Sequence, residues 1–280
     1  MKSGLYVVAT PIGNLGDMSL RAVEVLRDVE LIAAEDTRHS QRLLQHFAIT
    51  TATHAYHDHS GGRAAGKILG CLARGAAVAL ISDAGTPLIS DPGYRLVREV
   101  QEQGYDVFSV PGACAAIAAL SVSGLPTDRF LFEGFLPTKA GTRENRLRKL
   151  ASESSTLIFY EAPHRVHACL ESIQRVFGDQ REAVLAREIT KTFETIKRGT
   201  TAELVTFVAQ DTDQQRGEIV LIVEGKREQQ TELDGQSAAL LRRLAQELPA
   251  KRAAAVVADL SGLRKKVLYQ YLLDLKDEPC

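Results

Sequence analysis

The sequence predicts an α/β protein with two α/β domains followed by a small helical tail. Short apolar runs alternate with helical patterns through the first half of the chain, and this alternation is typical of a right-handed parallel sheet covered by helices. A Gly-Leu-Pro sequence at 124–126 marks a hinge, after which a second series of strands begins. The end of the chain holds helical patterns only. We therefore expect domains over 1–123 and 124–228 and a helical tail over 236–280.

The composition is that of a folded protein without a strong overall charge. Of the 280 residues, 45% are apolar and 25% are charged, and the formal net charge is −1. These values exclude a disordered chain and a basic field over the whole protein. The four cysteines stand singly, without the spacing of a zinc site or a disulfide framework. No apolar run has the length of a signal peptide or a membrane span, and we expect a protein of the reducing cytoplasm.

The first half is predicted to form buried strands joined by helices. Apolar runs that end abruptly in small or polar residues are typical of strands in a parallel sheet. Ser19 is a suitable N-cap for the first helix. The expected strands are 5–9, 31–34, 76–81 and 106–110, and the expected helices beyond the first are 62–74, 94–103 and 114–121.

The second half repeats the strand pattern and ends in helices. Ser261 and Gly262 join the last two helices, which is the arrangement of a helix-turn-helix. A tail that only packs three helices together is the alternative. The expected strands are 130–134, 156–160, 183–186 and 218–223, and the expected helices are 166–177, 240–248, 251–260 and 264–273.

The loop within 80–93 carries the strongest signal for a ligand. It follows a buried strand, Gly85 permits a positive φ, and two prolines stiffen it. Similar loops at Thr10 and Pro111 follow two other strands, and the carboxyl ends of parallel strands meet at one edge of a sheet. Neither a dinucleotide fingerprint nor a Walker A loop is present. An ordinary connection is the alternative, and residues 91–93 are expected to shape the next helix rather than contact the ligand.

A charged group follows the second strand. Glu35, Asp36 and Arg38 stand where that strand ends, and buried charges at such a place need partners. They form either a catalytic or substrate-orienting cluster or a solvated turn in which Asp36 caps the next helix. The residues alone leave both interpretations open.

A histidine-rich segment follows at 54–59. His54, His57, Asp58 and His59 are suitable ligand types for a metal, but the spacing lacks a helical His-x3-His pair and no cysteine joins it. We expect a polar wall of a substrate cleft here, and no metal.

Two segments are locally basic. Residues 129–149 hold six basic and two acidic side chains, and residues 236–280 hold eight basic and five acidic ones. Both are candidate phosphate-binding surfaces, although a charged run is also what a solvated helix face shows. The candidate RNA-binding residues are Arg143, Arg146, Arg264, Lys265 and Lys266.

Six motifs in order give a resemblance to a known family. The chain resembles the tetrapyrrole-methylase-like superfamily, and within it the enzymes that methylate bacterial small-subunit ribosomal RNA. The resemblance covers essentially the whole chain, including the tail. Its motifs are ATPIGNLGD, AAEDTR, SDAGTPLISDPG, PGACAA, FYEAPHR and AREITKTFET.

The resemblance implies a class III methyltransferase fold that binds S-adenosyl-methionine between two α/β domains. It implies methyl transfer by a homodimer to the ribose 2′-hydroxyl of a cytidine in the decoding centre of 16S rRNA, and we expect that rRNA to be bound within the small ribosomal subunit. The first loop, TPIGN, differs from that of the tetrapyrrole enzymes, which disfavours a porphyrin-like substrate. The implied cofactor-binding residues are Thr10, Pro11, Ser82, Asp83, Ala84, Gly85, Thr86, Pro111, Gly112, Ala113, Tyr160, Ala186 and Gly217.

Methyl transfer to a ribose hydroxyl needs in-line positioning and removal of a proton from a weak acid. We expect a carboxylate of the Glu35–Asp36 pair to act as base or orienter. Arg38 and Lys191 are expected to hold phosphate or stabilise the developing oxyanion. Two alternatives are a methyltransferase of a small tetrapyrrole-like molecule and a non-enzymatic RNA-binding protein.

Overall fold

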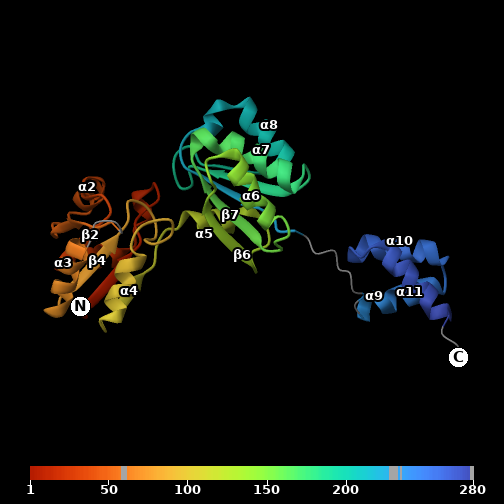
Figure 1. Ribbon diagram of the computed structural model, residues 1–280, viewed down its shortest axis with the longest axis horizontal. Helices are drawn as coiled ribbons and strands as arrows, with labels where there is room; N and C mark the ends of the chain where they lie inside the picture. Colours follow the sequence, from red (N-terminus) through yellow and green to blue (C-terminus); the bar gives the residue numbers. More distant parts are fainter. Residues whose placement is uncertain (58–61, 227–232, 234, 278–280) are drawn as a thin grey trace. The chain divides into compact units, whose positions relative to one another are not determined.

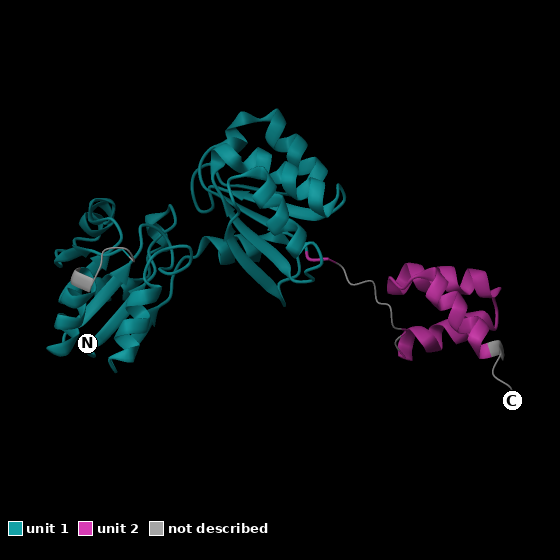
Figure 2. Ribbon diagram, viewed as in Figure 1, with its two compact units in different colours: residues 1–224 teal, residues 225–280 magenta. Residues whose placement is uncertain are grey.

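The computed structural model describes residues 1–57, 62–226, 233 and 235–277. The chain divides into two compact units, residues 1–224 and 225–280 (Figure 2). Both predicted α/β domains fall within the first unit, so their separate boundaries stay a prediction. None of the helices in the described part of the chain has the length and apolar character needed to cross a membrane.

The first sheet is fully parallel, as predicted. Its strand order is β3-β2-β4-β1-β5, with parallel pairing at each neighbour. The carboxyl ends of β1, β2 and β4 therefore meet at one edge. The strands are β1 (Gly4–Val8), β2 (Leu31–Ala34), β3 (Thr53–Ala55), β4 (Ala77–Ile81) and β5 (Val107–Val110).

Helices bury both faces of this sheet (Figure 1). Ser19 caps α1 as expected, accepting a hydrogen bond from the backbone N–H of Ala22 at 3.1 Å. A single-turn helix, η1 (Leu15–Asp17), precedes it. The helices that cover it are α1 (Leu20–Asp28), α2 (Thr37–His46), α3 (Gly62–Ala73) and α4 (Tyr94–Glu102), and α5 (Ala115–Ser123) follows β5.

The second sheet is mixed, with the order β6-β7-β10-β8-β9. Only β6 and β7 pair in parallel. Strand β9 was not predicted, because its TIKRGT sequence is charged and half exposed and lacks the apolar run of a buried strand. The strands are β6 (Phe130–Phe135), β7 (Thr156–Glu161), β8 (Glu182–Arg187), β9 (Thr195–Thr200) and β10 (Ile219–Val223).

The small-residue helix α5 connects the two sheets. It follows β5 of the first sheet and packs Ala116, Ala119 and Leu120 against apolar residues of the second sheet. The opposite face of that sheet is buried under α6 (Ala140–Leu150), α7 (Val166–Phe177) and α8 (Thr201–Gln210). Small side chains on α5 therefore allow close packing, and the loop before this helix lies beside both sheets.

The described residues of the second unit form three helices with a core of their own. Its helices are α9 (Gly235–Ala245), α10 (Ala250–Ser261) and α11 (Lys265–Asp277). Gly262 ends α10 in a left-handed conformation with φ 72°, which a glycine adopts without steric cost. The core is formed by Leu241, Ala253, Ala254, Val257, Leu263, Leu268 and Leu272.

Candidate functional site

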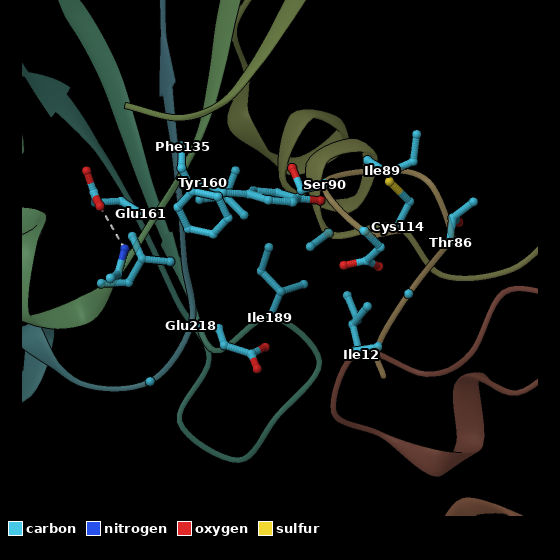
Figure 3. A pocket seen from close by; sticks show the side chains of 18 of the residues that line it. Ile12, Thr86, Ile89, Ser90, Cys114, Phe135, Tyr160, Glu161, Ile189 and Glu218 are labelled. Carbon is cyan, nitrogen blue, oxygen red and sulfur yellow. Dashed lines mark hydrogen bonds between the residues drawn. The ribbon is translucent and has the colours of Figure 1, made fainter. Parts of the chain in front are cut away.

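Loops from both sheets of the first unit enclose a cavity of about 370 Å³, called the first cavity below (Figure 3). Its wall is mostly apolar: Figure 3 shows Ile12, Ile189, Phe135 and the Tyr160 ring around the central space. The loop after β4, the start of α5, the loop after β8 and the turn before β10 all contribute. The wall residues are Ile12, Ala84, Gly85, Thr86, Ile89, Ser90, Asp91, Cys114, Ala115, Phe135, Tyr160, Glu161, Ala162, Pro163, Ile189, Gly217, Glu218, Ile219 and Val220.

The loops of the first sheet are tied together by backbone pairing. Thr10 and Gly85 exchange two backbone hydrogen bonds, of 2.8 and 3.1 Å. Thr86 donates its hydroxyl to the carbonyl of Ala113 at 2.9 Å. Gly85 has φ +81°, and a Cβ there would lie 3.2 Å from Ile12. The cavity edge is therefore fixed before any ligand binds.

Two strained residues turn the loop after Gly85 toward the cavity. Leu88 and Ser90 have φ values of 75° and 67°, a left-handed conformation that is uncommon for residues other than glycine. The following Asp91 lines the first cavity. The prediction that residues 91–93 shape the next helix rather than contact the ligand stays a prediction, although the place of Asp91 in the wall speaks against it there. Gly93 directly precedes α4 with φ 131°.

Tyr160 connects the second sheet to the start of α5. Its hydroxyl accepts a hydrogen bond from the backbone N–H of Ala116 at 3.1 Å. Burial, followed by the nearby Cys114, raises the pKa of the Tyr160 hydroxyl. The ring also makes edge contacts with Phe132 and Phe135 at 5.0 and 5.8 Å. Tyr160 therefore stays neutral and forms a fixed part of the wall.

The charges in the first cavity are all acidic among the described residues that line it. Glu161 is fully buried and lies 3.1 Å from Arg165, and Glu218 lies 3.1 Å from Lys191. Asp91 has no such cation among the described residues: the Ser82 hydroxyl bonds to it, while burial and Asp83 raise the pKa of its carboxyl. Asp91 is therefore a half-buried carboxyl without a cationic partner among the described residues.

A second cavity of about 330 Å³ adjoins the first, and Ile12, Ala84 and Glu218 line both. It lies between the loop after β1, the first turns of α2 and the loop after β8. Lys191 reaches it from the second sheet. The remaining wall residues are Thr10, Pro11, Gly13, Leu15, His39, Ser40, Arg42, Leu43, Ser82 and Asp83.

The predicted cofactor-binding residues divide between these cavities. Ala84, Gly85, Thr86, Tyr160 and Gly217 line the first, and Thr10, Pro11, Ser82, Asp83 and again Ala84 line the second. Pro111, Gly112 and Ala113 line neither cavity, and the wall begins at Cys114. Gly112 instead packs against Ala9, so closely that a Cβ on Gly112 would lie 2.9 Å from the Ala9 side chain. Ala186 also lines neither and lies in the core of the second sheet.

Of the four predicted catalytic residues, Lys191 lines the second cavity, while Glu35, Asp36 and Arg38 line neither cavity. Asp36 is the N-cap of α2 and accepts a hydrogen bond from the backbone N–H of Arg38 at 2.8 Å. The capping interpretation is thus the one that the structure shows for Asp36. The Arg38 side chain is 93% exposed and lies 3.8 Å from Asp36, and its predicted role in holding phosphate stays a prediction.

Glu35 lies beside the acidic residues of the cavity edge. Burial, then the charges of Asp91 and Asp83, raise the pKa of its carboxyl. A carboxyl with a raised pKa accepts a proton more readily near neutral pH. The catalytic role of Glu35 stays a prediction with this physical support.

Lys191 is held as a cation. Its ammonium lies 2.8 Å from Glu188 and 3.1 Å from Glu218. Burial works against the charged form, but these two carboxylates outweigh it and raise the pKa of Lys191. Lys191 therefore offers a positive charge at the cavity edge rather than a base.

The predicted RNA-binding residues differ in accessibility. Arg143 is 5% exposed and donates to Ser172, Thr138 and Ala168. The prediction that it contacts RNA is wrong for this structure, because its donors are used inside the protein. Arg146 forms an ion pair with Glu133 at 2.6 Å. Arg264, Lys265 and Lys266 are exposed where α11 begins.

The histidine-rich segment only partly lies within the described residues. His54 is in β3, and burial and then Lys67 lower its pKa. Asp58 and His59 lie outside the described residues. In the described part of the chain, no group of three His, Cys, Asp or Glu side chains is arranged to hold a metal.

Several wall residues were not singled out from the sequence. Cys114, Glu161 and Glu218 directly follow residues that the sequence predicts to bind the cofactor. Their position beside those residues was the one sequence feature that could have indicated them. His39, Ser40 and Arg42 gave no signal, because they lie on a helix whose apolar face alone has a recognisable period.

The comparisons with known proteins agree over most of the chain. The family of Tetrapyrrole (Corrin/Porphyrin) Methylases matches residues 4–205, and the RsmI C-terminal HTH domain matches residues 231–276. A protein of Pseudomonas aeruginosa, "Ribosomal RNA small subunit methyltransferase I", is 55% identical over 96% of both chains. Its counterpart in Escherichia coli O157:H7 is 51% identical over 96% of this chain and 94% of the relative.

This chain belongs to the ribosomal RNA small subunit methyltransferase I family. The predicted superfamily and fold class are thereby confirmed, as are the assignment as an enzyme and the use of S-adenosyl-methionine as methyl donor. The match to a named HTH domain also supports the helix-turn-helix interpretation of the tail.

Solved structures of the methylase superfamily share the fold of the first unit. A cobalt precorrin-4 methyltransferase has a TM-score of 0.57 at 15% identity and covers 79% of this chain and 94% of its own. A uroporphyrin-III C-methyltransferase from Thermus thermophilus, complexed with S-adenosyl homocysteine, has a TM-score of 0.54 at 18% identity and covers 79% and 97%. At this identity the likeness shows the fold alone.

Proposed function

We propose that this protein methylates the 2′-hydroxyl of a cytidine ribose in the decoding centre of 16S rRNA, and that it acts as a homodimer on the assembled small subunit. The observation that carries the proposal is the identity of 55% over 96% of the chain with a relative named for small-subunit rRNA methylation. This identity extends through the helical tail, which a methyltransferase of a small molecule does not need.

The first cavity suits S-adenosyl-methionine. Its volume of about 370 Å³ is within the usual range for a small-molecule site. The glycine at position 85 leaves room beside Ile12 that a Cβ would fill. Asp91 offers a carboxylate without a cationic partner among the described residues, and the donor carries positive sulfonium and ammonium groups. The apolar wall and one carboxyl without a cationic partner among the described residues therefore match the donor's chemistry.

S-adenosyl-methionine supplies, when bound, a methyl group already activated on a sulfonium. The task left to the protein is to orient the ribose, accept its proton and stabilise the oxyanion. Within this proposal Lys191, kept protonated by Glu188 and Glu218, provides the stabilising charge. Glu35 is the proposed proton acceptor, acting beside Asp83 and Asp91 at the cavity edge.

The test is transfer of a labelled methyl group to small subunits from a strain that lacks the gene, followed by nucleoside mapping. We expect label on the 2′-oxygen of one cytidine, and more label on assembled subunits than on free 16S rRNA. Label on a base would overturn the reaction type. Equal label on free RNA would overturn the subunit as substrate, and light scattering that gives a monomer mass would overturn the homodimer.

A further inference from the structure

The second cavity has a different electrostatic character from the first. Arg42, His39 and Lys191 line it together with the carboxylates of Asp83 and Glu218, whereas among the described residues no basic side chain lines the first cavity. The two cavities share Ile12, Ala84 and Glu218. A molecule in one therefore lies next to a molecule in the other, with only acidic charges around the first and both basic and acidic side chains around the second.

Arg42 is available to a ligand. No hydrogen bond or ion pair joins its side chain to any other residue in the described part of the chain. Lys191, by contrast, is already paired with Glu188 and Glu218, and Asp83 accepts a hydrogen bond from the backbone N–H of Asp36 at 3.1 Å. Arg42 is thus the positive charge of this cavity that has no protein counterion among the described residues.

Ser40 adds an independent observation. It is 3% exposed, and its hydroxyl oxygen is buried without a hydrogen-bond partner among the described residues. It lies two residues before Arg42 on α2 and lines the same cavity. A buried hydroxyl without a partner costs free energy, and a ligand that bonds to it removes that cost.

We propose that the second cavity binds the target nucleotide, with Arg42 holding the phosphodiester next to the reacting ribose and the Ser40 hydroxyl bonding to an oxygen of the same nucleotide. A guanidinium is suited to two-point binding of a phosphate. The inference rests on the proposed function, because it needs an RNA substrate. It extends that function to a substrate site that adjoins the first cavity through shared wall residues.

The test compares Arg42→Gln with Arg98→Gln as a matched control. Arg98 is an exposed arginine on α4 that pairs with Glu102 at 2.7 Å and lines neither cavity. For Arg42→Gln we expect the KM for small subunits to rise about tenfold. The slope of log affinity against log salt should fall in magnitude by about 0.7–0.9, the loss of one phosphate contact. Calorimetry should show unchanged S-adenosyl-methionine binding for both variants.

Ser40→Ala is a second test of the proposal, and it does not depend on the Arg42→Gln variant. It removes only the hydroxyl, so the helix and the salt slope should stay unchanged while kcat/KM for subunits falls about fivefold. The proposal is overturned if Arg42→Gln matches Arg98→Gln in KM and salt slope, or if Ser40→Ala leaves kcat/KM unchanged. A failure of the proposed function looks different: the wild-type protein would then place no methyl group on a ribose.

Discussion

The aliphatic stem of Lys191 lies against the backbone of Gly13, so closely that a Cβ on Gly13 would come within 2.4 Å of the Lys191 Cε atom. Gly13 belongs to the loop after β1, and Lys191 to the loop after β8. A hydrogen bond from the Thr190 hydroxyl to the Asp17 carboxylate joins the same two loops. The contact therefore sets where the ammonium of Lys191 stands in the second cavity.

Gly13→Ala should displace Lys191 and lower kcat about tenfold or more, with little effect on S-adenosyl-methionine affinity. Because φ at Gly13 is +145°, alanine also strains the backbone. Gly104→Ala is the control: it has φ +80° with no atom within 4 Å of a Cβ. If Gly13→Ala and Lys191→Met had fully additive effects on kcat, the contact would not position the lysine.

The alkaline limb of the pH–rate profile should depend on the carboxylates around Lys191. Glu188→Gln removes one of the groups that raise the pKa of Lys191, so the ammonium should deprotonate at lower pH. Activity should then decline earlier as the pH rises, while the acidic limb stays in place. Lys191→Arg should move the alkaline limb to higher pH, because a guanidinium keeps its charge. An unchanged profile in both variants would exclude Lys191 as the stabilising cation.

Asp91→Asn should stabilise the ligand-free protein and weaken donor binding. A carboxyl whose pKa is raised by folding binds protons more tightly in the native state, so it destabilises the protein above its ordinary pKa of 3.8. The stabilisation by Asp91→Asn should be present at neutral pH and vanish as the pH falls below that value. After allowance for solvent screening it should not exceed about 1 kcal/mol, or about 2–4 °C in Tm.

The same variant distinguishes charge from shape in the first cavity. S-adenosyl homocysteine lacks the sulfonium charge of the donor. If Asp91 acts on that charge, Asp91→Asn should weaken the binding of S-adenosyl-methionine about tenfold. The binding of S-adenosyl homocysteine should weaken much less, and calorimetry measures both affinities. Equal losses would place Asp91 at the amino group that both molecules share.

We expect Glu35 to act in the chemical step and Asp36 to act only in stabilising α2. Asp36→Ala removes the N-cap of α2 and should cost about 1 kcal/mol of stability, with a single-turnover rate close to that of the wild type. Glu35→Gln should lower the single-turnover rate at least a hundredfold and remove the acidic limb of its pH profile. A full rate in Glu35→Gln would exclude this carboxylate as the base.

The exposed basic residues at the start of α11 should contribute binding energy but not chemistry. Replacing Arg264, Lys265 and Lys266 together by glutamine should raise the KM for subunits and lower the magnitude of the salt slope by about two. Neither donor affinity nor the kcat at saturating subunits should change. Lys251→Gln with Arg252→Gln, on exposed positions of α10, is the charge control, and an equal effect there would indicate general attraction to RNA.

The sequence by itself determined the parallel first sheet, the strand ends that carry the site and the helical tail. These features follow local rules: apolar runs of strand length, an N-cap at Ser19, and a glycine at position 262 where the chain must turn left-handed. The order of six short motifs was enough to identify the superfamily.

Only the tertiary structure decided which polar residues are available. Arg143 has the same local sequence signal as an exposed arginine, yet it is buried, because α6 turns it toward α7. Asp91 faces the first cavity because Leu88 and Ser90 are left-handed, which no sequence period indicates. Which charges are paired depends on residues distant along the chain, such as Lys191 and Glu218. Burial and long-range pairing arise from packing between elements, and local sequence contains neither.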